Sequence, residues 1–113
     1  MAKKINLNDY LGHSMDCTCG KEHKTNLKIV DIDKDAVSRL PKHIEALGYK
    51  KPFLVADVNT WAAAGALVAE KLDVADISYK KYIFNEKELI PDEKTLGSLM
   101  MAFPRDCDVI IAI

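Results

Sequence analysis

Apolar and polar residues follow one another in blocks that predict strands alternating with helices. Residues 25–32, TNLKIVDI, place apolar side chains at positions 27, 29, 30 and 32, a mostly alternating pattern typical of a strand near a sheet edge. Residues 51–58, KPFLVADV, carry a continuous apolar run from Phe53 to Ala56, as expected for a parallel strand covered on both faces. Residues 76–84, DISYKKYIF, and residues 107–113, CDVIIAI, predict two further strands.

The first helix is predicted over residues 35–47, where apolar residues recur on one helical face: Val37, Leu40, Ile44 and Leu47. Pro41 interrupts this pattern, because proline lacks the N–H group that a helix interior uses. We therefore expect a short turn up to Leu40 and then the helix proper, with Pro41 in its first turn and Gly48 as a left-handed stop. His43 lies on this helix away from any strand end, so we expect it to face solvent.

Two more helices are predicted further along the chain. The stretch NTWAAAGALVAEKL directly follows the strand at residues 51–58, and Asn59 or Thr60 is its expected cap. The small residues from Ala62 to Ala66 would let this helix lie close to a sheet or to a bound molecule. A third helix begins after Pro91 with Asp92 as its cap, and its apolar residues, Leu96, Leu99, Met100 and Phe103, recur at helical spacing. Met100 is expected to fill the core.

This order of elements, β-α-β-α-β-α-β with short connections, predicts one fold class. Strands that alternate with helices require right-handed crossovers and a parallel sheet with helices on both faces. The prediction is an open α/β sheet of the doubly wound, Rossmann-like type. The two lysines of YKKY, residues 79–82, indicate an edge strand, since charged residues discourage pairing between sheets.

Composition excludes several classes of protein and partner. The chain has 113 residues, of which 49% are hydrophobic, and a formal net charge of −1, which indicates one globular domain and excludes a disordered chain. Without a basic excess, nucleic acid and anionic lipid are not expected partners, whereas a small molecule or a protein is. No apolar run is long enough for a signal peptide or a membrane span, so the expected location is the cytoplasm. Three cysteines are too few for a disulfide scaffold, and Cys107 is expected to be a small buried residue.

Residues that follow the carboxyl ends of parallel strands are the candidates for binding, because ligands of open sheets lie there. Asp57 follows the strand at residues 51–58, where its carboxylate could accept hydrogen bonds from both hydroxyls of an adenosine ribose and would disfavour a 2′-phosphate. The same residue could instead cap the helix that begins near Asn59, and spacing alone leaves both interpretations open. The chain has neither a GxGxxG nor a GxxxxGK[ST] motif, although DVIIAI is the kind of strand that such a phosphate-binding turn follows.

The segment CTCGKEH contains potential metal ligands: Cys17, Cys19 and His23. Thiolate sulfur and imidazole suit zinc, but a C-x-C pair is tighter than the usual C-x2-C and only three donors are local. His13 and Asp16 could complete a set. A tight turn around Gly20 with thiols that face solvent explains the same residues, so both interpretations remain.

Several motifs together resemble a known enzyme family. These are CTCGKEHKT, DAVSRLPKHIEALG, KPFLVADVNTWAAAG and LIPDEKTLGSLMMAFPRDCDVIIAI, which cover nearly all of residues 17–113. They resemble the amino-terminal part of the bacterial sn-glycerol-1-phosphate dehydrogenases, within the superfamily of glycerol dehydrogenase, dehydroquinate synthase and iron-dependent alcohol dehydrogenases. The CxCGxxH, ADxNT and LxPDE motifs are specific as an ordered set, while each alone is weak.

The resemblance implies an activity and a cofactor. The family reduces dihydroxyacetone phosphate to sn-glycerol 1-phosphate with NADH or NADPH, and a divalent metal, nickel or zinc, held in a helical carboxyl-terminal domain acts as Lewis acid. By this resemblance Asp57 contacts the adenosine ribose, and Asn59 and Thr60 support it. Val58 departs from the family pattern, where a glutamate is common. The resemblance assigns no catalytic residue and no ligand of the catalytic metal to this chain.

The resemblance also implies a domain organisation. Residues 1–24 are expected to form an amino-terminal arm with the CxCGxxH turn, and residues 25–113 an incomplete dinucleotide-binding domain that lacks the glycine-rich loop and the helical metal-binding domain. The chain alone is therefore expected to be inactive. Two alternatives remain: a glycerol or polyol dehydrogenase of the same superfamily, and a stand-alone α/β binding module with Cys17, Cys19 and His23 as a zinc clip. An exposed terminal strand would also invite a homo-oligomer.

Overall fold

The computed structural model describes residues 5–113. The chain forms two compact units that divide between Lys34 and Asp35. Residues 25–34 lie in the first unit, and the second unit contains the parallel sheet. None of the helices among the described residues combines the length and apolar character that a bilayer crossing requires.

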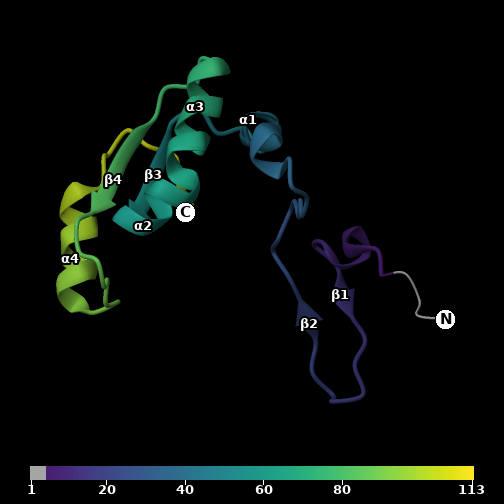
Figure 1. Cartoon of the computed structure of the whole chain (residues 1–113). Coiled ribbons are helices and arrows are strands. Elements are labelled where there is room, and N and C mark those ends of the chain that lie inside the picture. Colours follow the sequence, from purple (N-terminus) through teal and green to yellow (C-terminus); the bar gives the residue numbers. More distant parts are fainter. Residues whose placement is uncertain (1–4) are drawn as a thin grey trace. The chain divides into compact units, whose positions relative to one another are not determined.

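The first unit consists of a short 3₁₀-helix and one small hairpin. The 3₁₀-helix η1 spans Leu7–Tyr10, and the antiparallel strands β1, Ser14–Met15, and β2, His23–Lys24, form the hairpin (Figure 1). None of the described residues of this unit is buried. A two-stranded hairpin of this size has no apolar core to stabilise it.

The strand predicted over residues 25–32 is absent, and that prediction is wrong. Within the described part of the chain these residues belong to no strand, and Leu27 and Ile32 remain 58% and 82% exposed. A strand needs a neighbouring strand for its backbone hydrogen bonds and a surface to cover its apolar side, and no strand of residues 5–113 pairs with this segment. The alternating pattern is therefore compatible with a strand, but it does not form one without a strand to pair with.

The second unit is an α/β fold with a three-stranded parallel sheet in the order β4-β3-β5. This confirms the predicted fold class of an open parallel sheet flanked by helices. Its elements in chain order are α1 Ala36–Ala46, β3 Pro52–Asp57, α2 Val58–Thr60, the π-helical turn η2 Trp61–Gly65, α3 Ala66–Val74, β4 Lys80–Phe84, α4 Glu93–Ala102 and β5 Val109–Ala112.

The central strand β3 carries the core on both of its faces, because successive side chains of a strand point to opposite sides. Leu54 is fully buried in a cluster with Ile44 of α1 and Leu72 of α3. Its neighbour Phe53 is equally buried and packs edge-on against Phe103, which follows α4, with ring centroids 5.4 Å apart. Both faces of β3 are therefore covered, as its continuous apolar run predicted.

Helix α1 runs through Pro41 without a break, so the prediction of a separate short turn up to Leu40, with Pro41 in the first turn of the helix proper, is wrong. Proline removes one helical hydrogen bond, whereas the apolar face on both sides of it packs on the core, with Ile44 only 4% exposed. This packing extends the helix back to Ala36. The predicted stop at Gly48 is confirmed: its φ is +81°, and its N–H donates to the carbonyl of Glu45 at 2.9 Å.

Two side chains predicted from the helical patterns lie elsewhere than expected. His43 is half-buried and has an interaction partner, so it is not simply solvent-facing. Met100 is 69% exposed on α4, a helix with no buried residue, so its prediction as core filler is wrong. Helical spacing identified the apolar side of α4, but the described residues provide little surface to cover it.

Trp61 and Gly65, the first and last residues of the π-helical turn η2, lie in close contact. Gly65 is buried, and a β-carbon there would lie within 2.9 Å of Trp61 Cδ2, which is closer than non-bonded carbons approach. Lys81 of β4 places its ammonium 4.6 Å from the centre of the same ring, a cation–π distance. Of the small residues predicted to allow close packing, Gly65 makes room for the Trp61 ring, while Ala62, Ala63 and Ala66 are exposed.

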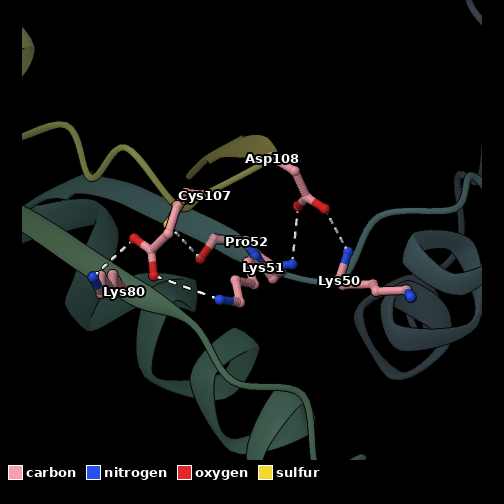
Figure 2. Close-up of polar contacts among 7 residues, drawn as sticks. Lys50, Lys51, Pro52, Lys80, Cys107 and Asp108 are labelled. Carbon is pink, nitrogen blue, oxygen red and sulfur yellow. Dashed lines mark hydrogen bonds and ion pairs between the residues drawn. The ribbon is translucent and has the colours of Figure 1, made fainter.

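A polar clamp joins the amino-terminal ends of the three strands (Figure 2). The Asp108 carboxylate accepts hydrogen bonds from the backbone N–H groups of Lys50 and Lys51, both at 2.9 Å, and the Asp108 N–H donates to the carbonyl of Lys51. Lys80 of β4 donates to Asp106 at 2.9 Å, and Lys51 Nζ lies 3.7 Å from that carboxylate. The clamp thus connects β5 to both other strands.

The clamp also changes the acidity of its groups. Hydrogen bonds from the two lysine N–H groups lower the pKa of Asp108, and the hydrogen bond from Lys80 lowers the pKa of Asp106. Cys107 lies between them, half-buried rather than fully buried, with its Sγ 3.8 Å from the Pro52 carbonyl oxygen; burial raises its pKa. Sequence reasoning missed the two aspartates, although the Asp-Cys-Asp spacing directly before a strand was a usable signal. The predicted edge position of Lys80 and Lys81 is confirmed, since β4 is one of the two outer strands of this sheet.

Replacing Gly65 by Ala should destabilise the chain, because the new methyl group overlaps the Trp61 ring. We expect a loss of about 1–3 kcal/mol in the free energy of unfolding, measured by urea denaturation. Gly97→Ala is the matched control: Gly97 lies in α4, and a β-carbon added there would have no neighbouring atom within 4 Å. That change should stabilise the chain by roughly 0.5–1 kcal/mol. Equal effects of the two changes would contradict the role given to Gly65.

Replacing Asp108 by Asn should weaken the fold more at neutral pH than in acid. The folded pKa of Asp108 lies below its ordinary value of 3.8, so its stabilisation is present above that value and is lost as the pH falls through the folded pKa. We expect a lower urea midpoint for Asp108→Asn at about pH 7 and a smaller difference from the parent chain at about pH 2. Glu70→Gln, on the exposed side of α3, is the control; a constant difference across this range would count against the clamp.

Candidate functional site

The strand order identifies the edge of the sheet at which a ligand would bind. In chain order the three parallel strands are β3, β4 and β5, and in space β3 lies between the other two. After β3 the chain forms β4 on one side of β3, and after β4 it crosses over to form β5 on the other side. The point between β3 and β5 is therefore a topological switch point. Ligands of open α/β sheets bind outside the carboxyl ends of the strands at such a point. Asp57, the last residue of β3, lies there.

Asp57 caps the helix that follows β3. Its Oδ1 accepts hydrogen bonds from the N–H groups of Asn59 and Thr60, both at 2.8 Å, and Thr60 Oγ1 accepts from the Asp57 N–H at 3.0 Å. This reciprocal pair is a capping box, which satisfies the free N–H groups of a first helical turn. The prediction that Asn59 or Thr60 caps the helix is wrong, because the helix begins at Val58, directly after the strand.

Capping leaves one oxygen of Asp57 uncommitted. Both capping bonds end on Oδ1, and among residues 5–113 no group donates a hydrogen bond to Oδ2. The side chain is only partly buried. The two interpretations of Asp57 are therefore compatible: one oxygen holds the helix, and the other can accept a hydrogen bond from a ligand hydroxyl at the switch point.

Asn59 and Thr60 have structural roles beside Asp57. Asn59 Nδ2 donates to the backbone carbonyl of Lys87 at 3.1 Å, which attaches the helix start to the loop after β4. Thr60 completes the capping box. These contacts are structural: Thr60 hydrogen-bonds to Asp57, and Asn59 hydrogen-bonds to the loop after β4. The role of both residues beside a bound cofactor stays a prediction.

A small pocket lies beyond the carboxyl end of β4, between that loop and α4. Its volume is about 170 Å³, and Glu86, Glu88 and Asp92 contribute carboxylates to its lining. Asp92 caps α4, as predicted, by accepting from the Thr95 N–H at 2.8 Å, and this bond lowers the pKa of Asp92. A lining with this excess of negative charge disfavours a phosphate. The pocket is therefore a poor candidate for holding the phosphates of a nucleotide.

The other predicted site residues gather in the hairpin of the first unit. The Sγ atoms of Cys17 and Cys19 and a ring nitrogen of His23 all lie within 4.8 Å of one another. Cys19 Sγ lies 2.9 Å from His23 Nε2, and the Cys19 N–H donates to Cys17 Sγ at 3.5 Å. That hydrogen bond lowers the pKa of Cys17. His13 and Asp16, predicted as further ligands, are not part of this group within the described residues.

Comparison with curated proteins found relatives that cover most of this chain. A glycerol-1-phosphate dehydrogenase [NAD(P)+] of Halalkalibacterium halodurans is 32% identical over 102 residues, which are 87% of this chain and 26% of the relative. The enzymes of the same name from Bacillus licheniformis and Geobacillus stearothermophilus are 33% and 25% identical over 85% and 95% of this chain, and over 25% and 28% of their own lengths. These matches confirm the resemblance predicted from the motifs.

The match covers only part of each relative. The chain spans about a quarter of the length of the curated relatives that it matches. No protein-family model matches the chain. No solved structure matches it significantly either.

Substitutions at Asp57 should separate its capping role from its charge. Asp57→Ala removes the acceptor for two N–H groups, and we expect it to lower the free energy of unfolding by about 0.5–2 kcal/mol. Asp57→Ser should stay within about 0.5 kcal/mol of the parent chain, because a serine hydroxyl is an equally good cap. Urea denaturation measures both. If serine destabilises as much as alanine, then capping is not what Asp57 contributes to the fold.

Proposed function

We propose that this chain is the part of an NAD(P)-dependent glycerol-1-phosphate dehydrogenase that holds the adenosine half of the dinucleotide. In the parent enzyme, dihydroxyacetone phosphate and NAD(P)H would give sn-glycerol 1-phosphate and NAD(P)+. Similarity to relatives of that name over most of the chain supports the family. One observation carries the binding role: Asp57 lies at the switch point of a parallel sheet with Oδ2 free of hydrogen bonds from the described residues.

The residues around Asp57 fit a ribose better than a phosphate. A carboxylate oxygen accepts from a ribose hydroxyl but repels a 2′-phosphate, so the site favours NAD over NADP. Ala62 and Ala63 are exposed in the turn that follows Asp57 and offer little bulk to obstruct a nucleotide. Asn59 and Thr60 position the surroundings through the contacts described above. The pyrophosphate and the nicotinamide are assigned to no residue of this chain.

The catalytic metal of the proposed parent enzyme is likewise assigned to no residue here. The family resemblance implies a nickel or zinc ion as Lewis acid. The family resemblance also implies aspartate and histidine ligands for that ion, whereas the potential metal cluster among residues 5–113 consists of two cysteines and a histidine. We therefore propose that the chain alone does not reduce dihydroxyacetone phosphate.

Two alternatives have less support. A glycerol or polyol dehydrogenase of the same superfamily would use the same ribose contact, but the relatives found carry the name glycerol-1-phosphate dehydrogenase. A stand-alone binding module would share the sheet and the cap, yet it would not account for similarity to these enzymes over most of the chain.

Titration of the isotope-labelled chain with NAD+ and NADP+, followed by NMR, tests the binding role. We expect amide shifts concentrated between Asp57 and Gly65, and binding of NAD+ about tenfold tighter than binding of NADP+. Asp57→Ser, which keeps the cap, should weaken NAD+ binding about tenfold, because the ribose loses its charged acceptor.

Two controls make this titration decisive. Asp92→Ser changes the corresponding cap of α4 and should leave NAD+ binding unchanged. Addition of dihydroxyacetone phosphate, NADH and nickel should give no turnover. The proposal would be abandoned if Asp57→Ser bound NAD+ as the parent chain does, or if the shifts clustered away from the carboxyl end of β3.

A further inference from the structure

We propose that Cys17, Cys19 and His23 bind a zinc ion that stabilises the β1–β2 hairpin. This site is separate from the dinucleotide contact and from the catalytic metal discussed above. It lies in the first unit of the chain, whereas Asp57 lies in the second. The inference has two independent supports: the geometry of the three donor atoms and the lack of any apolar core among the described residues around them.

The donor atoms are already close to the arrangement that zinc requires. In a tetrahedral site, bond lengths of about 2.3 Å to sulfur and 2.0–2.1 Å to nitrogen separate neighbouring ligand atoms by roughly 3.5–3.8 Å. Here the three donor atoms lie within 4.8 Å of one another, and the closest pair, Cys19 Sγ and His23 Nε2, is 2.9 Å apart. Shifts of about 1 Å, within the reach of side-chain rotation, would bring all three to bonding positions.

The backbone of the hairpin holds the two cysteines on one turn. The Gly20 N–H donates to the Cys17 carbonyl at 3.3 Å, and Gly20 has a φ of +77°, a conformation that glycine adopts without strain. This turn brings Cys19 back beside Cys17, and pairing of Met15 with His23 in the ladder brings the imidazole to the same place. The C-x-C spacing, tighter than usual, is therefore accommodated by a turn centred within the motif.

The second support is energetic. None of residues 5–34 is buried, and each strand of the hairpin is two residues long. Isolated hairpins are at best marginally stable in water. A contact between Ser14 Oγ and Glu22 Oε1 at 2.7 Å joins the strands, but both groups are exposed. A metal bound only by the folded form would supply the missing free energy, as in small zinc domains.

The exposure of the three ligand residues determines the coordination that we expect for the zinc ion. All three ligands are exposed, and His13 and Asp16 are outside the cluster. The fourth tetrahedral position would therefore be open to water. Thiolate and imidazole donors favour Zn²⁺ over oxygen-preferring ions such as Mg²⁺ and Ca²⁺.

Metal binding by the whole 113-residue chain tests the proposal. The reduced chain, freed of metal, is titrated with Co²⁺ and then with Zn²⁺. We expect about one equivalent of Co²⁺ to give thiolate charge-transfer absorption that Zn²⁺ abolishes. Cys19→Ser and His23→Gln should each weaken binding about 100-fold. Cys107→Ser, which changes the cysteine beside β5, should leave it unchanged.

A second measurement follows the hairpin itself. Zn²⁺ should slow tryptic cleavage after Lys21 and Lys24 about tenfold in the parent chain and not in Cys19→Ser. Cleavage after Lys87, in the loop after β4, should be unaffected. Trp61, the single tryptophan, reports separately that the sheet unit of each variant is folded.

Three results would overturn the proposal. One is a parent chain that binds no Co²⁺ or Zn²⁺ when fully reduced. Another is a Cys19→Ser or His23→Gln variant with unchanged affinity and a folded sheet unit. The third is zinc that binds stoichiometrically and leaves cleavage at Lys21 and Lys24 as fast as before, because the ion would then have no effect on the hairpin.

Discussion

The parallel pairing of β3 with β4 on one side and β5 on the other determines most of what the second unit can do. This pairing buries Phe53 and Leu54 on opposite faces of one strand. It also sets a common direction for three carboxyl ends, which brings Asp57 to a switch point. The clamp of Asp106 and Asp108 acts at the opposite end, where it ties β5 to the start of β3 and to β4 (Figure 2). The clamp therefore stabilises the amino-terminal ends of the strands, and Asp57 lies at the carboxyl end of β3.

Asp57 has a structural role as a helix cap, and this role is compatible with the proposed binding role because a carboxylate has two oxygens. Oδ1 satisfies two N–H groups at the start of the helix, which fixes the orientation of the side chain. Because the side chain is already held in this way, it loses little conformational freedom when a ligand hydroxyl binds to Oδ2. The capping box therefore does not compete with the proposed ribose contact and instead preorganises it. The small residues after Thr60 serve a different end, since Gly65 makes room for Trp61.

The two units of the chain differ in how much apolar surface they bury. The sheet unit has a cluster of buried apolar residues that includes Ile44, Leu54 and Leu72. The hairpin unit has no buried residue among its described residues. It contains instead the cluster of two thiols and one imidazole. A segment that cannot bury apolar surface needs another source of free energy to hold one conformation, and a coordinated metal is such a source.

The sequence by itself determined the fold class, the strand at Pro52–Asp57, the cap at Asp92, the stop at Gly48 and the edge position of Lys80 and Lys81. These features depend on local preference or on continuous apolar runs, which a single stretch of chain contains in full. Tertiary structure decided the rest. Packing on the core carried α1 through Pro41, and residues 25–32 formed no strand because no strand among residues 5–113 pairs with them. The apolar spacing of α4 did not lead to burial of any of its residues. Each of these outcomes depends on whether a distant segment supplies a surface or a hydrogen-bonding partner, and local sequence does not contain that information.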